Sequence, residues 1–131
     1  MLRRNNPKPI ISRLAPSFDH ASSLGRELKD ARRSLILNEA RLDRYIHNGA
    51  GGIYLEKFGD AATAPIDLAL ELITRFPKEF VPWVQKIEQV TATQMDRILK
   101  RIPNDWMSEV QGTFAKALVL KAKEILCQTN R

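Results

Sequence analysis

Hydrophobic residues recur at helical spacing near the end of the chain. The run includes Val110, Phe114, Ala117, Leu118, Lys121, Ala122 and Ile125. These positions follow one face of an α-helix. Ser108 and Gln111 just before the run have the spacing of a capping box. We therefore expect a long amphipathic helix behind Ser108, with the Lys121 stem on the core and its ammonium group in water.

Two further helices are expected upstream of it. Thr91 and Gln94 have capping-box spacing, and the apolar residues Met95, Ile98 and Leu99 follow. We expect Pro103 to end that helix. A preceding helix is expected to begin near Pro82 and to carry Trp83, Val84 and Ile87. All of these connections are short, which is typical of a helical bundle.

The segment from Thr63 to Phe76 is apolar on almost every side. Its apolar residues are Ile66, Leu68, Ala69, Leu70, Leu72 and Ile73. We expect Thr63 to cap a helix here, because Pro65 then falls in the first turn, where proline is best tolerated. Phe76 and Pro77 should end it. A helix that is apolar all round should be deeply buried.

The first half of the chain is less regular. Asp30 is expected to cap a helix that runs to about residue 47, with Leu35, Leu42, Tyr45 and Ile46 on its apolar positions and Arg32, Arg33, Arg41 and Arg44 on other faces. We expect Gly49 to end it in a left-handed cap. Ahead of it, the run Ile10 to Leu14 between two prolines is typical of a short strand.

These elements together predict a mainly α fold. We expect a single domain over residues 1–131, in which residues 1–29 hold the strand and a loop and residues 30–131 form a helical bundle. No apolar run reaches the length of a membrane span. One cysteine, Cys127, excludes an internal disulfide framework, and we interpret it as a packing residue. These features favour a cytoplasmic setting.

Positive charge is concentrated in the first half. The net charge is +6, and residues 1–50 hold ten Lys and Arg against five Asp and Glu. The phosphate of a nucleotide, a nucleic acid and an acidic protein partner all fit such a surface, and so does a merely solvated basic face. No recognition helix is evident, so any nucleic-acid binding is expected to be weak and non-specific.

Two familiar kinds of site are not indicated. His20 and His47 lie too far apart in sequence for a zinc motif. The glycines Gly49, Gly51 and Gly52 follow a helix rather than a strand, and no Lys-Ser/Thr pair comes after them. We interpret them as a turn rather than as a phosphate loop.

The most informative stretch is residues 10–25, IISRLAPSFDHASSLG. Here a short strand leads into Leu14, Pro16, Phe18 and Asp19, which match an L-x-P-x-[FY]-D pattern. The sequence resembles the HipA-like serine/threonine kinases, which are toxins of type II toxin–antitoxin systems. Softer matches extend over nearly the whole chain. The resemblance implies a kinase C-lobe in which Asp19 binds the magnesium that bridges the phosphates of ATP. Without the resemblance, Asp19 would be interpreted as an Asx-turn residue.

The remaining parts of a kinase are not found in the sequence. The glycine-rich loop, the N-lobe lysine, the catalytic aspartate and the metal-binding asparagine have no match, and no aspartate precedes Asp19. We therefore expect a C-terminal fragment of a larger kinase, which is inactive alone, has no catalytic residue of its own and binds neither magnesium nor ATP tightly. Its partner would be an N-terminal kinase half or an antitoxin protein. The alternative is a non-catalytic helical interaction module that binds an antitoxin or nucleic acid.

Overall fold

The computed structural model describes residues 23–52, 54 and 62–128. Over these residues the chain is mainly helical, as the sequence predicted, and contains no strand. The helices are α1 (Asp30–Asn38), α2 (Leu42–His47), α3 (Pro65–Arg75), α4 (Pro77–Glu88), α5 (Ala92–Leu99) and α6 (Glu109–Gln128). The strand expected at residues 10–14 lies outside the described residues.

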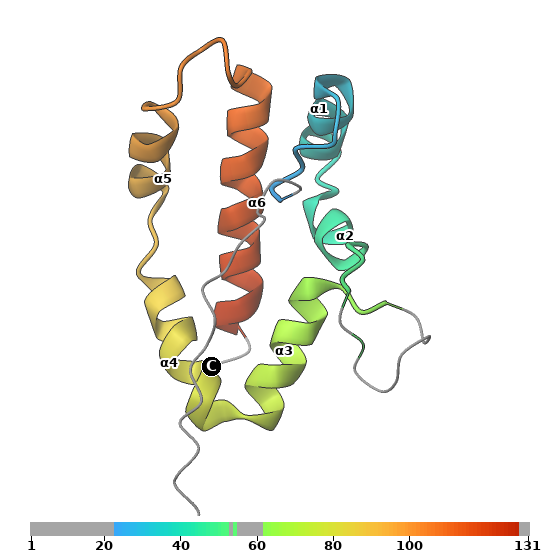
Figure 1. Ribbon diagram of the computed structural model, residues 1–131, viewed down its shortest axis with the longest axis vertical. Coiled ribbons are helices and arrows are strands. Elements are labelled where there is room, and N and C mark those ends of the chain that lie inside the picture. The colour runs from blue at the N-terminus through green and yellow to red at the C-terminus, as the bar shows by residue number, and fades with distance from the viewer. Residues whose placement is uncertain (1–22, 53, 55–61, 129–131) are drawn as a thin grey trace, which may run out of the picture.

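The long helix α6 is the centre of the fold. It contacts each of the other five helices, with α4 and α5 on one side and α1, α2 and α3 on the other (Figure 1). Phe114 of α6 is fully buried, and the ring of Tyr45 meets it edge to face at 5.5 Å between centroids. Edge-to-face pairs of this kind stabilise a core beyond the area that they bury. The fully buried apolar set is small: Ile36, Ala64, Ile66, Ile73, Val84, Phe114 and Ala115.

The prediction of a single helix from Asp30 to about residue 47 is wrong, because the helix is interrupted at Ala40. Ala40 has φ of +51°, and its N–H donates to the carbonyl of Leu37 while the N–H of Arg41 donates to the carbonyl of Ile36. These two bonds define a Schellman motif, which ends α1 and turns the chain into α2. The left-handed cap expected at Gly49 is also wrong. Among the described glycines only Gly25 has a positive φ.

Two of the expected N-caps are displaced by one residue. Lys29, and not Asp30, is the N-cap of α1, so that Asp30 becomes the first residue of the helix. Ala64, and not Thr63, is the N-cap of α3, while Pro65 takes the first helical position as predicted. Neither of the observed cap residues accepts a hydrogen bond through its side chain.

The burial of α3 and the start of α4 also differ from expectation. Ile66 and Ile73 of α3 are buried, but its leucines, Leu68, Leu70 and Leu72, are only partly so. Helix α4 begins at Pro77 rather than near Pro82, because proline also fits its first position.

The helix starts predicted at Thr91 and Ser108 are confirmed. Thr91 and Gln94 form the reciprocal capping box, and the Ser108 hydroxyl accepts from the Gln111 N–H at 3.1 Å. The ammonium group of Lys121 lies 3.7 Å from Asp43 and 3.2 Å from Glu124, with its stem half-buried, as expected. None of the described helices is both long enough and apolar enough to cross a bilayer.

Candidate functional site

The magnesium-binding role of Asp19 stays a prediction, because Asp19 lies outside the described residues. The first described residue is Ser23, four residues after Asp19. In that part no group of three or more His, Cys, Asp or Glu side chains is arranged to hold a metal ion. The site is therefore built from the loop at residues 23–28 and from the helices that it meets.

This loop is held by a close approach between Gly25 and α6. Leu24 and Gly25 both have positive φ, +57° and +71°, and the N–H of Arg26 donates to the carbonyl of Ser23. Two consecutive positive φ values are the pattern of a type I′ turn. A Cβ at position 25 would lie 2.5 Å from Phe114 Cε1, which is too close for any atom of a side chain. Glycine is thus required both by the backbone angle and by the aromatic ring.

Arg33 of α1 ties the same loop to the bundle. Its side chain is only 5% exposed, and Nη2 donates to the carbonyl oxygens of Gly25 and Arg26 at 3.1 and 3.0 Å. Nη1 donates to the carboxylate of Asp30 at 2.5 Å. Nε is buried and has no partner among the described residues. A buried guanidinium that satisfies two backbone carbonyls fixes the path of the chain.

Asp30 links this cluster to the start of α6. The Ser108 hydroxyl, which also caps α6, donates to the Asp30 carboxylate, and Arg33 lies on its other side. The hydrogen bond from Ser108, followed by the bond and charge of Arg33, lowers the pKa of Asp30 below its ordinary value. Asp30 therefore stays ionised at neutral pH and joins the N-termini of two helices.

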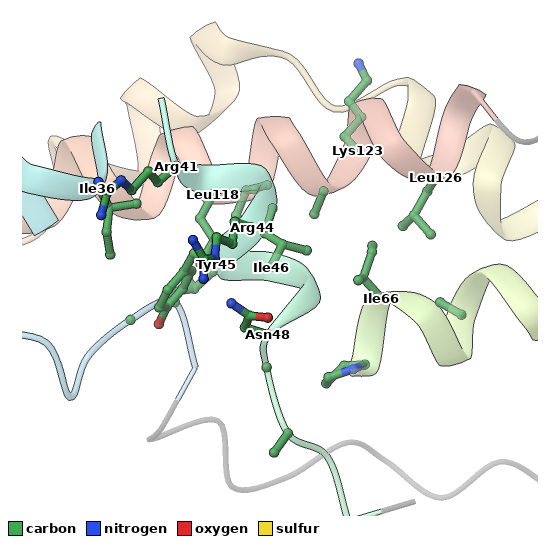
Figure 2. A pocket seen from close by; sticks show the side chains of 18 of the residues that line it. Ile36, Arg41, Arg44, Tyr45, Ile46, Asn48, Ile66, Leu118, Lys123 and Leu126 are labelled. Atoms are coloured by element: carbon green, nitrogen blue, oxygen red, sulfur yellow. The ribbon is translucent and has the colours of Figure 1, made fainter. Parts of the chain in front are cut away.

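Beside the anchored loop lies a cavity of about 1000 Å³. Its walls come from the loop, from α1, α2 and α3, from the end of α4 and from α6. Figure 2 shows Leu126 of α6 and Ile66 of α3 pointing toward one another across it. The side chains that line it are mostly apolar: Leu24, Ile36, Ile46, Pro65, Ile66, Ala69, Ile87, Val90, Leu118, Val119, Ala122 and Leu126. A space of this size with apolar walls falls in the range of ligand-binding pockets.

The charged residues around the cavity are all cationic. They are Arg32, Arg41, Arg44 and Lys123, and no Asp or Glu is among the described residues that line it. Arg41 pairs with Glu39, and the ammonium group of Lys123 donates to the carbonyl of Val90 at 2.7 Å. Arg32 and Arg44 have no ion pair or side-chain hydrogen bond with any described residue. Within the described part of the chain, an anion that binds these two arginines would displace no existing partner.

A second polar contact lies outside the cavity, between α2 and α3. His47 Nδ1 is 2.6 Å from Asp67 Oδ1, and both side chains are partly exposed. The pair joins the end of α2 to the first turn of α3.

Sequence reasoning missed the anchoring role of Arg33. It placed Arg33, like Arg32, on faces of the helix other than the apolar one, whereas the structure buries Arg33 and exposes Arg32. The cavity was missed as well, since its walls come from segments more than a hundred residues apart. The sequence held one signal of the different orientation of Arg33. Arg32 and Arg33 are adjacent in a predicted helix, and two neighbouring helical residues cannot both face the same way.

The family assignment has no support from similarity to known proteins. No protein-family model, curated protein or solved structure matches the chain. The HipA-like resemblance therefore remains a proposal carried by residues 10–25, and the site stands on its own geometry: an anchored glycine loop beside an apolar cavity rimmed by arginines.

Proposed function

We propose that these residues form the helical C-lobe portion of a HipA-like serine/threonine kinase, in which Asp19 is the magnesium-binding carboxylate. The proposal rests on the match of Leu14, Pro16, Phe18 and Asp19 to the family pattern. The mainly helical bundle is compatible with it.

The structural observation that supports the proposal is the anchoring of the loop that follows the motif. Gly25 comes six residues after Asp19 and is locked against Phe114, while Arg33 holds its carbonyl. Leu24 beside it has a positive φ, which costs a non-glycine residue roughly 1–2 kcal/mol. Strained backbone of this kind is typical of positions that hold a ligand-binding segment in place. Arg32 and Arg44, which have no ion pair with any described residue, line the same cavity as this loop and would favour phosphate.

The chemistry that these residues can support is limited. When bound, magnesium would neutralise phosphate charge, and Asp19 is the one carboxylate that the resemblance offers for it. Phosphoryl transfer also needs a lysine, a catalytic aspartate and a second metal ligand acting together. The sequence holds no match to these groups. We therefore expect weak nucleotide binding without phosphate transfer, and a separate kinase half or an antitoxin as the partner.

The test is calorimetric titration with Mg-ADP. The proposal predicts millimolar binding that is lost in Asp19→Asn and kept in the control Asp105→Asn, an exposed aspartate in the connection between α5 and α6. The same proteins should release no phosphate from γ-labelled ATP. Absence of binding, or equal binding in both variants, would refute the magnesium role. Turnover by the chain alone would refute the predicted inactivity.

A second candidate function, that of a non-catalytic interaction module, is favoured by apolar side chains that remain exposed just before α4, on α4 and α5, and in the connection between α5 and α6. Phe76, Trp83, Ile98 and Trp106 are large apolar side chains that remain exposed, the last by 78%. Exposed aromatic residues are enriched at protein interfaces. If an antitoxin binds these exposed side chains, mutation of Trp83 and Trp106 would abolish its binding while Mg-ADP binding stays intact.

A further inference from the structure

The cavity between α3 and α6 divides into a polar end and an apolar end. Figure 2 shows Arg41, Arg44, Tyr45 and Asn48 gathered at the α2 end, whereas the other end is formed by Ile66 and Leu126. Lys123 points away from the space and is already bonded to Val90. A ligand that fits must therefore be apolar along most of its length and polar at one end.

The positive charge at the polar end favours a negatively charged ligand. Arg44 and Arg32 line the cavity without any described counter-ion, and none of the described lining residues is a carboxylate. An anionic group near the rim would gain an arginine partner without breaking an ion pair between described residues. A cationic group there would meet arginines that no described carboxylate offsets. Charge complementarity thus favours an anion.

The apolar wall sets the length of the ligand. The cavity of about 1000 Å³ has room for an extended alkyl chain, whose carbons lie about 4 Å from the wall atoms that they contact. From Leu118 to Leu126 the apolar wall of α6 runs about 12 Å, at 1.5 Å per residue.

We propose that this cavity binds an anionic amphiphile, a single alkyl chain that ends in a carboxylate. The carboxylate lies against Arg44 and Arg32, and the chain runs between α3 and α6 toward Ile66 and Leu126. This proposal uses described residues only. It does not depend on the kinase resemblance or on Asp19, so either proposal can fail without the other.

The test uses decanoate, decyltrimethylammonium and acetate as probes, each below the concentration at which micelles form. Methyl NMR spectra follow the side chains of Leu118, Leu126 and Ile66. The proposal predicts one saturable decanoate site that shifts these methyl groups, at least fivefold weaker binding of decyltrimethylammonium, and no shifts with acetate. Equal affinity for the two decyl compounds, or shifts confined to the methyl groups of the exposed Ile98 on α5, would overturn it.

Two variants test separately where the carboxylate and the alkyl chain of the ligand bind. Arg44→Gln should weaken decanoate binding about two- to fivefold and leave decyltrimethylammonium binding unchanged or tighter, since an exposed ion pair contributes roughly 0.2–1 kcal/mol. Arg97→Gln on α5 is the matched control and should change neither. Ala122→Phe should fill the cavity and block both decyl compounds. If the Ala122→Phe variant fails to fold, the effect of Arg44→Gln on decanoate binding still tests the proposal.

A polypeptide occupant is the competing outcome. A synthetic amphipathic helix with leucine on one face and glutamate on the other serves as that probe. If the peptide shifts the cavity methyl groups and decanoate does not, the cavity is a protein-docking groove and the amphiphile proposal is wrong. Binding of decanoate with no competition from the peptide supports the proposal.

Discussion

The backbone of Gly25 lies directly against the ring of Phe114, so that a Cβ at position 25 would be 2.5 Å from Phe114 Cε1 and 3.0 Å from Cδ1. Phe114 is the one large side chain with no exposed surface among the described residues. The loop that follows Asp19 in sequence is thus built onto the most buried point of the bundle. A substitution that disturbs the loop at this contact should therefore also lower the stability of the whole bundle.

Gly25→Ala should be strongly destabilising. The substitution places a methyl group into the Phe114 ring and also forces alanine to adopt φ near +71°. We expect the free energy of unfolding to fall by about 2–4 kcal/mol in urea denaturation. Gly52→Ala is the control, because nothing lies within 4 Å of the new methyl group there, and should stay within about 0.5 kcal/mol of the parent. Equal effects at the two sites would contradict the close packing.

Ala40→Gly should stabilise the protein. Ala40 holds the left-handed position of the Schellman motif that ends α1, a position for which glycine is the preferred residue. Removing its Cβ should raise the free energy of unfolding by about 0.5–1 kcal/mol, despite the greater freedom of glycine in the unfolded chain. Ala117→Gly in the interior of α6 should have the opposite sign, with a loss of roughly 1 kcal/mol. A loss at position 40 would show that the helix does not break there.

Arg33→Met should remove the tie between α1 and the loop. The change leaves the carbonyls of Gly25 and Arg26 without a donor, and each unsatisfied buried acceptor costs about 1–3 kcal/mol. We expect a loss of about 2–4 kcal/mol in the free energy of unfolding. The neighbour Arg32 is exposed, so Arg32→Met should change stability by no more than about 0.5 kcal/mol. Similar losses in both variants would contradict the burial of Arg33.

Asp30 should give stability a specific dependence on pH. Its pKa is lowered by the Ser108 hydroxyl and by Arg33, so the folded state holds its proton less tightly than the unfolded chain. The resulting stabilisation is fully present above the ordinary value of 3.8 and is lost as pH falls through the lowered pKa. In Asp30→Asn, unfolding curves measured across the acid range should therefore show a weaker fall in stability. An unchanged pH profile would contradict the assignment.

Much of the fold was predictable because its signals are local. The Thr91–Gln94 box lies within one helical turn, the apolar run behind Ser108 follows the face of one continuous helix, and both were confirmed. The break after α1 was not predictable, because the residue in the left-handed position is Ala40, which gives no turn signal. The start of α4 was misplaced because both Pro77 and Pro82 fit a first helical turn, and only tertiary packing decides between them.

The site was less predictable than the fold. The Asp19 motif is visible in sequence because its residues are neighbours, and its role remains a prediction. The cavity joins Leu24 to Leu126, and the orientation of Arg33 depends on the loop carbonyls that it meets. Such contacts depend on how helices pack against α6, which periodicity along one helix does not reveal.

The magnesium-binding role of Asp19 is tested most directly by paramagnetic NMR. Mn²⁺-ADP, added to the 15N-labelled protein, binds in place of the magnesium complex and broadens amide signals close to the metal. The account predicts that the amides of Leu24 and Gly25 broaden before that of Trp106, and that Asp19→Asn abolishes this preference. Uniform broadening along the chain, or the same pattern in Asp19→Asn, would contradict it.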